Sequence, residues 1–102
     1  MPYYAIYCID HPEHNVEKRR SVRPAHLQRL KELAETKRLH SAGPLFQRDG
    51  NNPLLDGVHG SMIIVDFDDR ISAQAWAAAD PYVTAGIYDS ITIHRYEPLE
   101  LL

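Results

Sequence analysis

Apolar and β-branched residues recur along the chain in four short runs that predict β-strands. The runs are Tyr3–Asp10, Leu39–Phe46, Gly60–Phe67 and Ile87–Tyr96. The first run is apolar on both of its alternating faces, which is typical of a central strand that is covered on both sides. Because proline has no N–H for a strand ladder, the Gly43–Pro44 pair predicts an edge or bulged position for the second strand.

The stretch Arg19–Thr36 has the three- and four-residue spacing of an amphipathic helix. Its apolar stripe comprises Leu27, Leu30, Leu33 and Ala34. Ser21 is the expected N-cap, which would place Pro24 in the first turn, where a missing N–H is tolerated. His26 lies on the same stripe, so we expect its ring to point toward the core.

A second helix is expected over Ile71–Ala79, and it is ended by Asp80–Pro81, because the residue before a proline is pushed out of the helical region. Its expected buried stripe is Ile71, Ala75, Trp76 and Ala79. The connection Gln47–His59 is rich in aspartate, asparagine, glycine and proline, and these residues predict a long loop. Loops of this length in a compact domain are uncommon and are often functional.

The order of these elements, βαββαβ, predicts the ferredoxin-like α+β fold. Both helices then cover one face of a four-stranded sheet. The other face would carry tyrosines, a cysteine or methionine and small polar groups, and such a surface is too apolar to be left in water. We therefore expect a homodimer, or a larger assembly built on it, in which two sheets face each other and form an α+β barrel. The alternative is a monomer with a solvated sheet.

Length and composition narrow the class of protein further. The 102 residues are enough for one domain, residues 1–102, and the net charge of −3 shows no basic excess for a nucleic-acid partner. Cys8 is the only cysteine, which excludes an internal disulfide and a thiolate zinc site and fits a reducing compartment. The histidines lack metal-ligand spacing, so we expect neither a metal nor a cofactor. With no basic leader and no apolar run of bilayer length, we expect a cytoplasmic protein without membrane contact.

The predicted topology brings two candidate catalytic residues to the same end of the helical layer. His26 lies in the opening turns of the first helix, and Asp80 follows the end of the second. A carboxylate at a helix C-terminus faces the negative end of the helix dipole, which is unfavourable by about 0.3–1 kcal/mol. A neighbouring imidazolium would offset this, and the aspartate would fix the tautomer that general acid–base chemistry needs. The alternatives are a core histidine and an aspartate that only ends the helix.

Five further residues at this end are candidate substrate-binding positions. Arg19 and Arg23 suit a small carboxylate or phenolate, because arginine binds such anions bidentately. Ser61 would donate a hydrogen bond to the substrate, and no G-x-S-x-G elbow marks it as a nucleophile. Tyr88 would supply a wall and a hydroxyl, and Pro44 lies at the same end of the sheet. The alternatives are a solvated basic helix start and an aromatic core.

Several motifs also resemble the YciI-like (YCII-related) family. They are RSVRPAHLQRL at Arg20–Leu30, AGP at Ala42–Pro44, GS at Gly60–Ser61 and AQAWAAADPYVTAGIY at Ala73–Tyr88. The resemblance implies a dimeric α+β barrel of ferredoxin-like protomers and a His–Asp site, which maps by motif onto His26 and Asp80. One branch of this family is a dehydrochlorinase that acts on a chlorinated hydroxyhydroquinone, whereas most members have no established reaction.

These observations lead to the hypothesis of a small cofactor-free enzyme. His26, oriented by Asp80, would move a proton on a small hydroxylated or cyclic substrate in a lyase, dehydrochlorinase or isomerase reaction. Arg23 and Ser61 would hold the oxyanion or hydroxyl of that substrate. One alternative is a non-catalytic homodimer that binds a small metabolite or a partner protein. A second is a dimeric-barrel monooxygenase, for which the sequence offers no convincing Trp/Asn/His set.

Overall fold

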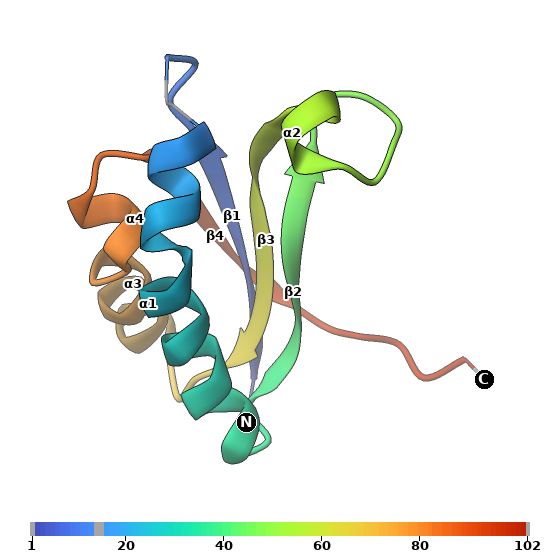
Figure 1. Cartoon of the computed structure of the whole chain (residues 1–102). Helices are drawn as coiled ribbons and strands as arrows, with labels where there is room; N and C mark the ends of the chain where they lie inside the picture. The colour runs from blue at the N-terminus through green and yellow to red at the C-terminus, as the bar shows by residue number, and fades with distance from the viewer. Residues whose placement is uncertain (1, 14–15, 102) are drawn as a thin grey trace.

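The computed structural model describes residues 2–13 and 16–101 (Figure 1). Within these ranges one antiparallel sheet is formed by β1 (Tyr3–Asp10), β2 (Leu39–Phe46), β3 (Val58–Asp66) and β4 (Tyr88–Tyr96). The strand order is β2-β3-β1-β4, so β1 is central and β2 lies at an edge, as predicted. The ferredoxin-like α+β fold is therefore confirmed.

The helices form a layer on one face of the sheet. α1 (Val16–Glu35), α3 (Arg70–Ala78) and the short α4 (Pro81–Thr84) make up this layer, whereas α2 (Pro53–Asp56) lies on the connection between β2 and β3 (Figure 1). The connection Gln47–His59, which was predicted as a long loop, thus contains one helical turn. None of the helices in the described ranges is long and apolar enough to cross a membrane.

The apolar core lies between the helical layer and the covered face of the sheet. Alternate residues of β1 and β3 point into it, which gives both strands a two-residue burial period. The core includes Tyr4, Ile6, Cys8, Ile63 and Val65 from these strands, Leu30 and Leu33 from α1, and Ala73 and Ala77 from α3. This packing fixes α1 across the sheet and thereby determines where its opening turns lie.

The first helix begins earlier than predicted. Because α1 already starts at residue 16, Ser21 is not its N-cap, and Pro24 lies in its interior instead of its first turn. An interior proline costs a helix about 3 kcal/mol, since it removes one N–H donor and crowds the preceding turn. The turns before Pro24 are held by Arg19, whose buried side chain is hydrogen-bonded to Asp10. The contact between Arg19 and Asp10 therefore outweighs the helix start that Ser21 and Pro24 predict.

The buried face of the second long helix was also predicted wrongly. Ile71 is 76% exposed and Ala75 is exposed, whereas Ala73 and Ala77 are buried against the sheet. Two alanines four residues apart lie on one face of a helix and allow its backbone to approach the strands closely. That orientation turns Ile71 toward solvent and leaves Trp76 half-buried at the edge of the core.

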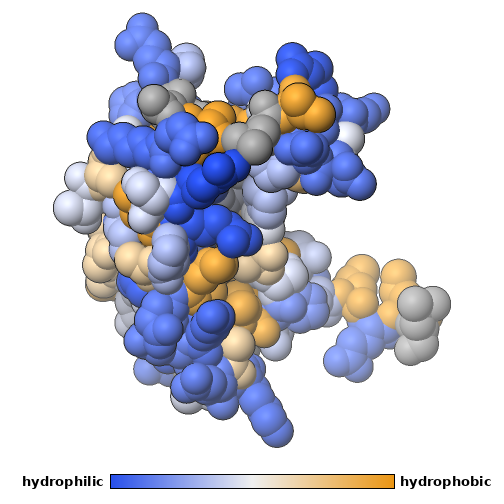
Figure 2. Space-filling view, in the orientation of Figure 1, coloured by the Kyte–Doolittle hydropathy of each residue, from blue (hydrophilic) through white to orange (hydrophobic). Residues whose placement is uncertain are grey.

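The opposite face of the sheet carries the half-buried side chains Tyr3, Ala5, Tyr7 and Ile9 of β1, with Met62 and Ile64 of β3. Met62 thus lies on the predicted face, whereas Cys8 belongs to the core. The tail after β4 projects from the body and carries exposed Leu99 and Leu101 (Figures 1 and 2). The homodimer that this face suggested stays a prediction.

Candidate active site

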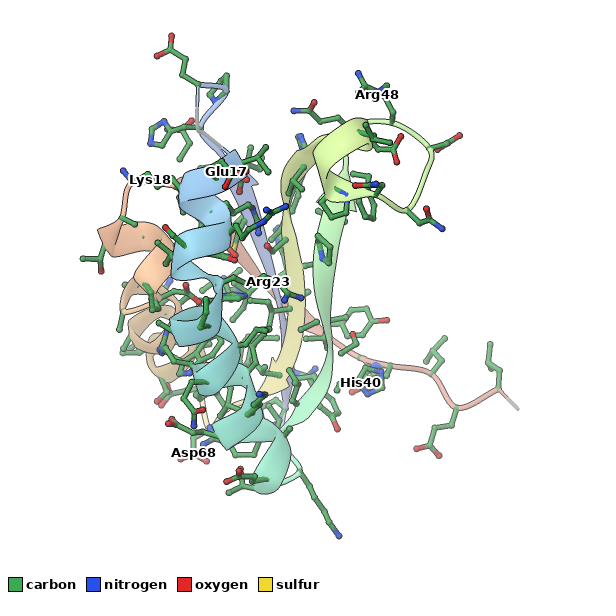
Figure 3. All side chains as sticks on the ribbon, in the orientation of Figure 1. Glu17, Lys18, Arg23, His40, Arg48 and Asp68 are labelled. Atoms are coloured by element: carbon green, nitrogen blue, oxygen red, sulfur yellow. The ribbon has the colours of Figure 1, made fainter. Side chains whose placement is uncertain are left out.

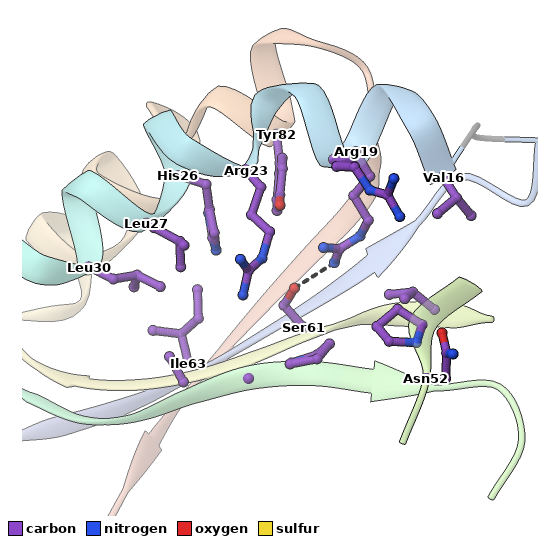
Figure 4. Close-up of a pocket in the computed structure, with 16 residues that line it drawn as sticks. Val16, Arg19, Arg23, His26, Leu27, Leu30, Asn52, Ser61, Ile63 and Tyr82 are labelled. Carbon is purple, nitrogen blue, oxygen red and sulfur yellow. Dashed lines mark hydrogen bonds between the residues drawn. The ribbon is translucent and has the colours of Figure 1, made fainter. Parts of the chain in front are cut away.

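A pocket of about 440 Å³ opens between the first half of α1 and the sheet, near the β2–β3 connection (Figure 4). Its apolar wall comprises Leu27, Leu30, Pro44, Val58 and Ile63. Its polar side chains include Arg19, Arg23, His26 and Ser61, and one end is lined by Asn52 and Pro53 at the start of α2. Figure 2 shows hydrophilic side chains bordering this hollow, with hydrophobic atoms beside them. A cavity of this size accommodates a single-ring guest.

His26 lines this pocket and contacts Asp80 behind it, although 54 positions separate the two residues in the sequence. Nδ1 of His26 lies 2.8 Å from Oδ2 and 3.0 Å from Oδ1 of Asp80, and both side chains are buried. A carboxylate only accepts hydrogen bonds, so Nδ1 carries the proton of this contact. Nε2 has no hydrogen-bond partner in the described part of the chain, and the ring points into the pocket (Figure 4). The lone pair of the neutral imidazole is therefore available to a ligand.

Asp80 is held by more than the imidazole. It is the N-cap of α4, where its Oδ1 accepts the Tyr82 backbone N–H at 2.8 Å. The Arg29 guanidinium lies 3.6 Å from Oδ2 and stacks over the Trp76 ring. Asp80 follows the end of α3, as predicted, and a further short helix begins directly after it, so that the carboxylate also caps the Tyr82 N–H. Sequence analysis did not single out Arg29.

Tyr82 supports the imidazole from the helical layer. Its ring stacks on that of His26 with centroids 4.2 Å apart and an angle of 16° between the planes. The guanidinium carbon of Arg19 lies 4.6 Å from the same ring centroid. Burial raises the pKa of the Tyr82 hydroxyl, so this side chain stays neutral beside the pair of His26 and Asp80. These contacts fix the plane of His26 in addition to its tautomer.

A second hydrogen-bonded cluster lies beside the pair of His26 and Asp80. Arg19 donates from Nε to Asp10 at 3.0 Å and from Nη2 to Ser61 Oγ at 2.8 Å. The Tyr88 hydroxyl donates to the same Ser61 oxygen at 2.8 Å. Burial raises the pKa of Tyr88 far above its usual range, so this hydroxyl keeps its proton and stays a donor. Ser61 Oγ thus accepts two hydrogen bonds, and its own O–H is left to donate into the pocket.

The other predicted binding residues occupy different positions. Pro44 pairs with Ser61 across β2 and β3 and lines the pocket. Arg23 extends from α1 toward β3 and into the pocket (Figure 3). Tyr88 lies behind Ser61 and is not among the described residues that line the pocket, so the expectation of a direct substrate contact is corrected. Asp10 was missed, since its only signal was an acidic residue at the end of an apolar strand.

The connection between β2 and β3 is ordered by its own polar contacts. The Asp56 carboxylate accepts the Asn52 backbone N–H at 3.0 Å, and Arg48 donates to the Leu55 carbonyl. Gly57 has a φ of +72°, which only glycine adopts without strain. Among the described residues, no group of three histidine, cysteine, aspartate or glutamate side chains could hold a metal ion.

The comparisons with known proteins agree with this architecture. Residues 2–97 match the YCII-related domain. The chain belongs to the YCII-related family. Protein YciI of Escherichia coli is 46% identical over 94 residues, which are 92% of this chain and 95% of that protein. An uncharacterized protein of Haemophilus influenzae is 42% identical over 95 residues, which are 93% of this chain and 96% of that protein.

Among solved structures, this YCII-related chain is similar to the 5-chloro-2-hydroxyhydroquinone dehydrochlorinase TftG of Burkholderia phenoliruptrix in complex with 2,5-dihydroxybenzoquinone. The TM-score is 0.80, the identity is 22%, and the match covers 93% of both chains. At this level of identity the likeness shows a shared fold.

Proposed function

We propose that this protein is a small acid–base enzyme in which His26 transfers a proton on a ring-sized substrate. The observation that carries the proposal is the buried pair of His26 and Asp80, 2.8 Å apart, whose imidazole lines a pocket of about 440 Å³. A carboxylate that accepts from Nδ1 orients the imidazole and stabilises the positive charge that develops on it during proton transfer.

In the proposed reaction, Nε2 of His26 removes a proton from a carbon next to a carbonyl group of the ring. The electron pair of the broken C–H bond forms an enolate, whose oxygen accepts hydrogen bonds from Ser61 and Arg23. In an elimination, the enolate then expels a leaving group as an anion, and the imidazolium gives its proton to solvent. In an isomerisation, the imidazolium returns the proton to a different carbon. Asp80 keeps accepting the hydrogen bond from Nδ1 throughout.

The fold likeness supports the choice of reaction class and of test substrate. The protein from Burkholderia phenoliruptrix is a dehydrochlorinase bound to a dihydroxybenzoquinone. A ring of that size suits the volume of the pocket described here. Halogenated and hydroxylated rings are therefore the first compounds to test.

The test measures chloride release from 5-chloro-2-hydroxyhydroquinone, and isomerisation of hydroxylated cyclic enones, by wild type and by His26→Gln. We expect turnover to fall by about 10²–10⁴-fold in the variant, the usual contribution of a general acid–base group. The matched control is His11→Gln, because His11 is an exposed histidine outside the pocket. Equal turnover in wild type and His26→Gln contradicts the proposal. Ring binding without any turnover in wild type supports the non-catalytic alternative instead.

The proposal includes a second copy of the chain over the uncovered face of the sheet. Six half-buried side chains of β1 and β3, mostly apolar, support it, because a face of this kind is normally covered in soluble proteins. Light scattering should give the mass of a dimer for wild type and of a monomer for Ile64→Lys, which places a charge in the middle of that face. A monomeric wild type contradicts this part of the proposal.

A further inference from the structure

The basic side chains that line the pocket are paired with carboxylates, with one exception. Arg19, Arg20 and His26 lie 3.0, 3.7 and 2.8 Å from carboxylate oxygens of Asp10, Glu17 and Asp80. Arg23 has no ion pair or hydrogen bond within the described ranges, and it points from α1 into the pocket (Figures 3 and 4). No aspartate or glutamate is among the described residues that line this pocket. One positive charge is therefore left without a counter-charge.

The hydrogen-bonding groups near Arg23 impose a second condition on a ligand. Ser61 already accepts from Arg19 and Tyr88, so its hydroxyl has only a proton to offer. A guanidinium likewise only donates. Figure 4 shows Arg23 extending from α1 toward the part of the sheet that carries Ser61. A group bound between these two side chains must accept hydrogen bonds and has no acceptor to which it could donate.

The rest of the pocket wall determines which kind of molecule can carry this hydrogen-bond acceptor. The apolar side chains of Leu27, Leu30 and Ile63 lie together on the side of the pocket next to Arg23 (Figure 4). An apolar surface of this kind favours a ring over a flexible polar chain, because burying the ring faces releases water. The pocket thus combines an apolar wall with one cationic, donor-only end.

We infer that the ligand of this pocket is a ring-sized monoanion, with its charged oxygen between Arg23 and Ser61 and its ring on the apolar wall. This inference rests on the proposed function and names its substrate class. The anionic oxygen belongs either to a ring carboxylate or to an ionised ring hydroxyl. Both are charged acceptors that arginine binds through charge-assisted hydrogen bonds.

Calorimetric titration at neutral pH tests the inference with two matched pairs of probes. Benzoate is compared with benzamide, and 2-hydroxy-1,4-benzoquinone, whose single hydroxyl is ionised at neutral pH, is compared with 2-methoxy-1,4-benzoquinone, in which the same oxygen cannot ionise. We expect at least one anion to bind about tenfold or more tightly than its neutral counterpart. The pair that shows this preference identifies which kind of anion the site takes. Raising the salt concentration from about 0.05 to about 0.5 M should weaken the binding of the anion and leave the affinity for the neutral ring unchanged.

The decisive variant is Arg23→Gln, which should remove the preference for the anion while the neutral ring binds as in wild type. The matched control is Lys18→Gln, which removes the same charge from α1 on the side away from the pocket (Figure 3). Equal affinity for anion and neutral ring in wild type overturns the inference, as does a loss in Arg23→Gln that is the same for both. The titration needs no turnover. Selective anion binding without catalysis would therefore refute the proposed function alone, and turnover by a protein that shows no preference for the anion would refute this inference alone.

Discussion

The two halves of the layer between α1 and the sheet differ in what they bury. The half around Leu33 is packed with apolar side chains, including Tyr4 from β1 and Val65 from β3. The half around the pocket contains every buried polar or charged residue in the described part of the chain, namely Asp10, Arg19, His26, Ser61 and Asp80. Paired buried ions are rarely more stabilising than an apolar filling of the same volume. We therefore propose that ligand chemistry, and not stability, explains the polar half.

The largest effect is expected from breaking one ion pair in the polar half. Asp10→Leu leaves the buried Arg19 guanidinium without its carboxylate. We expect the free energy of unfolding to fall by about 3–5 kcal/mol, because an uncompensated charge then remains inside the protein. Urea denaturation followed by circular dichroism measures this change.

The matched control is the double variant Asp10→Leu/Arg19→Met, which replaces both ions with apolar side chains. It should recover most of the lost stability, since no unpaired charge remains. The affinity of the double variant for a ring ligand should be lower than that of wild type, because Ser61 loses the hydrogen bond from Arg19 that positions it. A double variant as unstable as the single one would show that this pair is needed for stability, against our account of the polar half.

In the apolar half, Leu33→Ala should lower the free energy of unfolding by about 3 kcal/mol, because a buried side chain leaves a cavity. Leu33 does not line the pocket, so ring affinity per folded molecule should be unchanged. Urea denaturation and calorimetric titration of the same sample check both statements. A clear loss of ring affinity in this variant would mean that the two halves are not separable.

Patterns that extend over whole elements could be predicted from the sequence. The strand order, the edge position of β2 and the proximity of His26 to Asp80 all follow from periodicity and from the direction in which each element runs. A histidine and an aspartate on different helices are thus placed at one end of the layer without any tertiary information.

Features decided by single tertiary contacts could not be predicted. The early start of α1 depends on Arg19 reaching Asp10, and a charged residue has no local signature of burial. The orientation of α3 depends on how closely Ala73 and Ala77 approach the sheet, so hydrophobicity alone favoured Ile71. Arg29 was missed for the same reason, since its role depends on an aspartate far along the chain.

The smallest effect is a loss of stability at alkaline pH. It is expected because the buried Cys8 and Tyr88 side chains behind the pocket keep their protons in the folded protein. Burial raises the pKa of Cys8 from 9.0 to about 12, and it raises the pKa of Tyr88 above its usual 10.0. The unfolded chain releases these protons at lower pH than the folded chain does. The resulting stability is therefore fully present below about pH 9 and is lost as the pH rises further.

Urea midpoints measured between about pH 8 and 11 should decline for wild type. The decline should be smaller for Tyr88→Phe than for Tyr96→Phe, in which an exposed tyrosine is changed in the same way. A midpoint that does not change with pH would contradict the proposed protonation of the buried groups.

The most direct test of the central claim is NMR of the imidazole nitrogens of His26. When the ring is neutral, the account predicts a proton on Nδ1, held by Asp80, and none on Nε2. In Asp80→Ala the preference for this tautomer should disappear. A proton on Nε2 in the wild-type protein, or an unchanged spectrum in Asp80→Ala, would contradict the claim that Asp80 prepares His26 as a base.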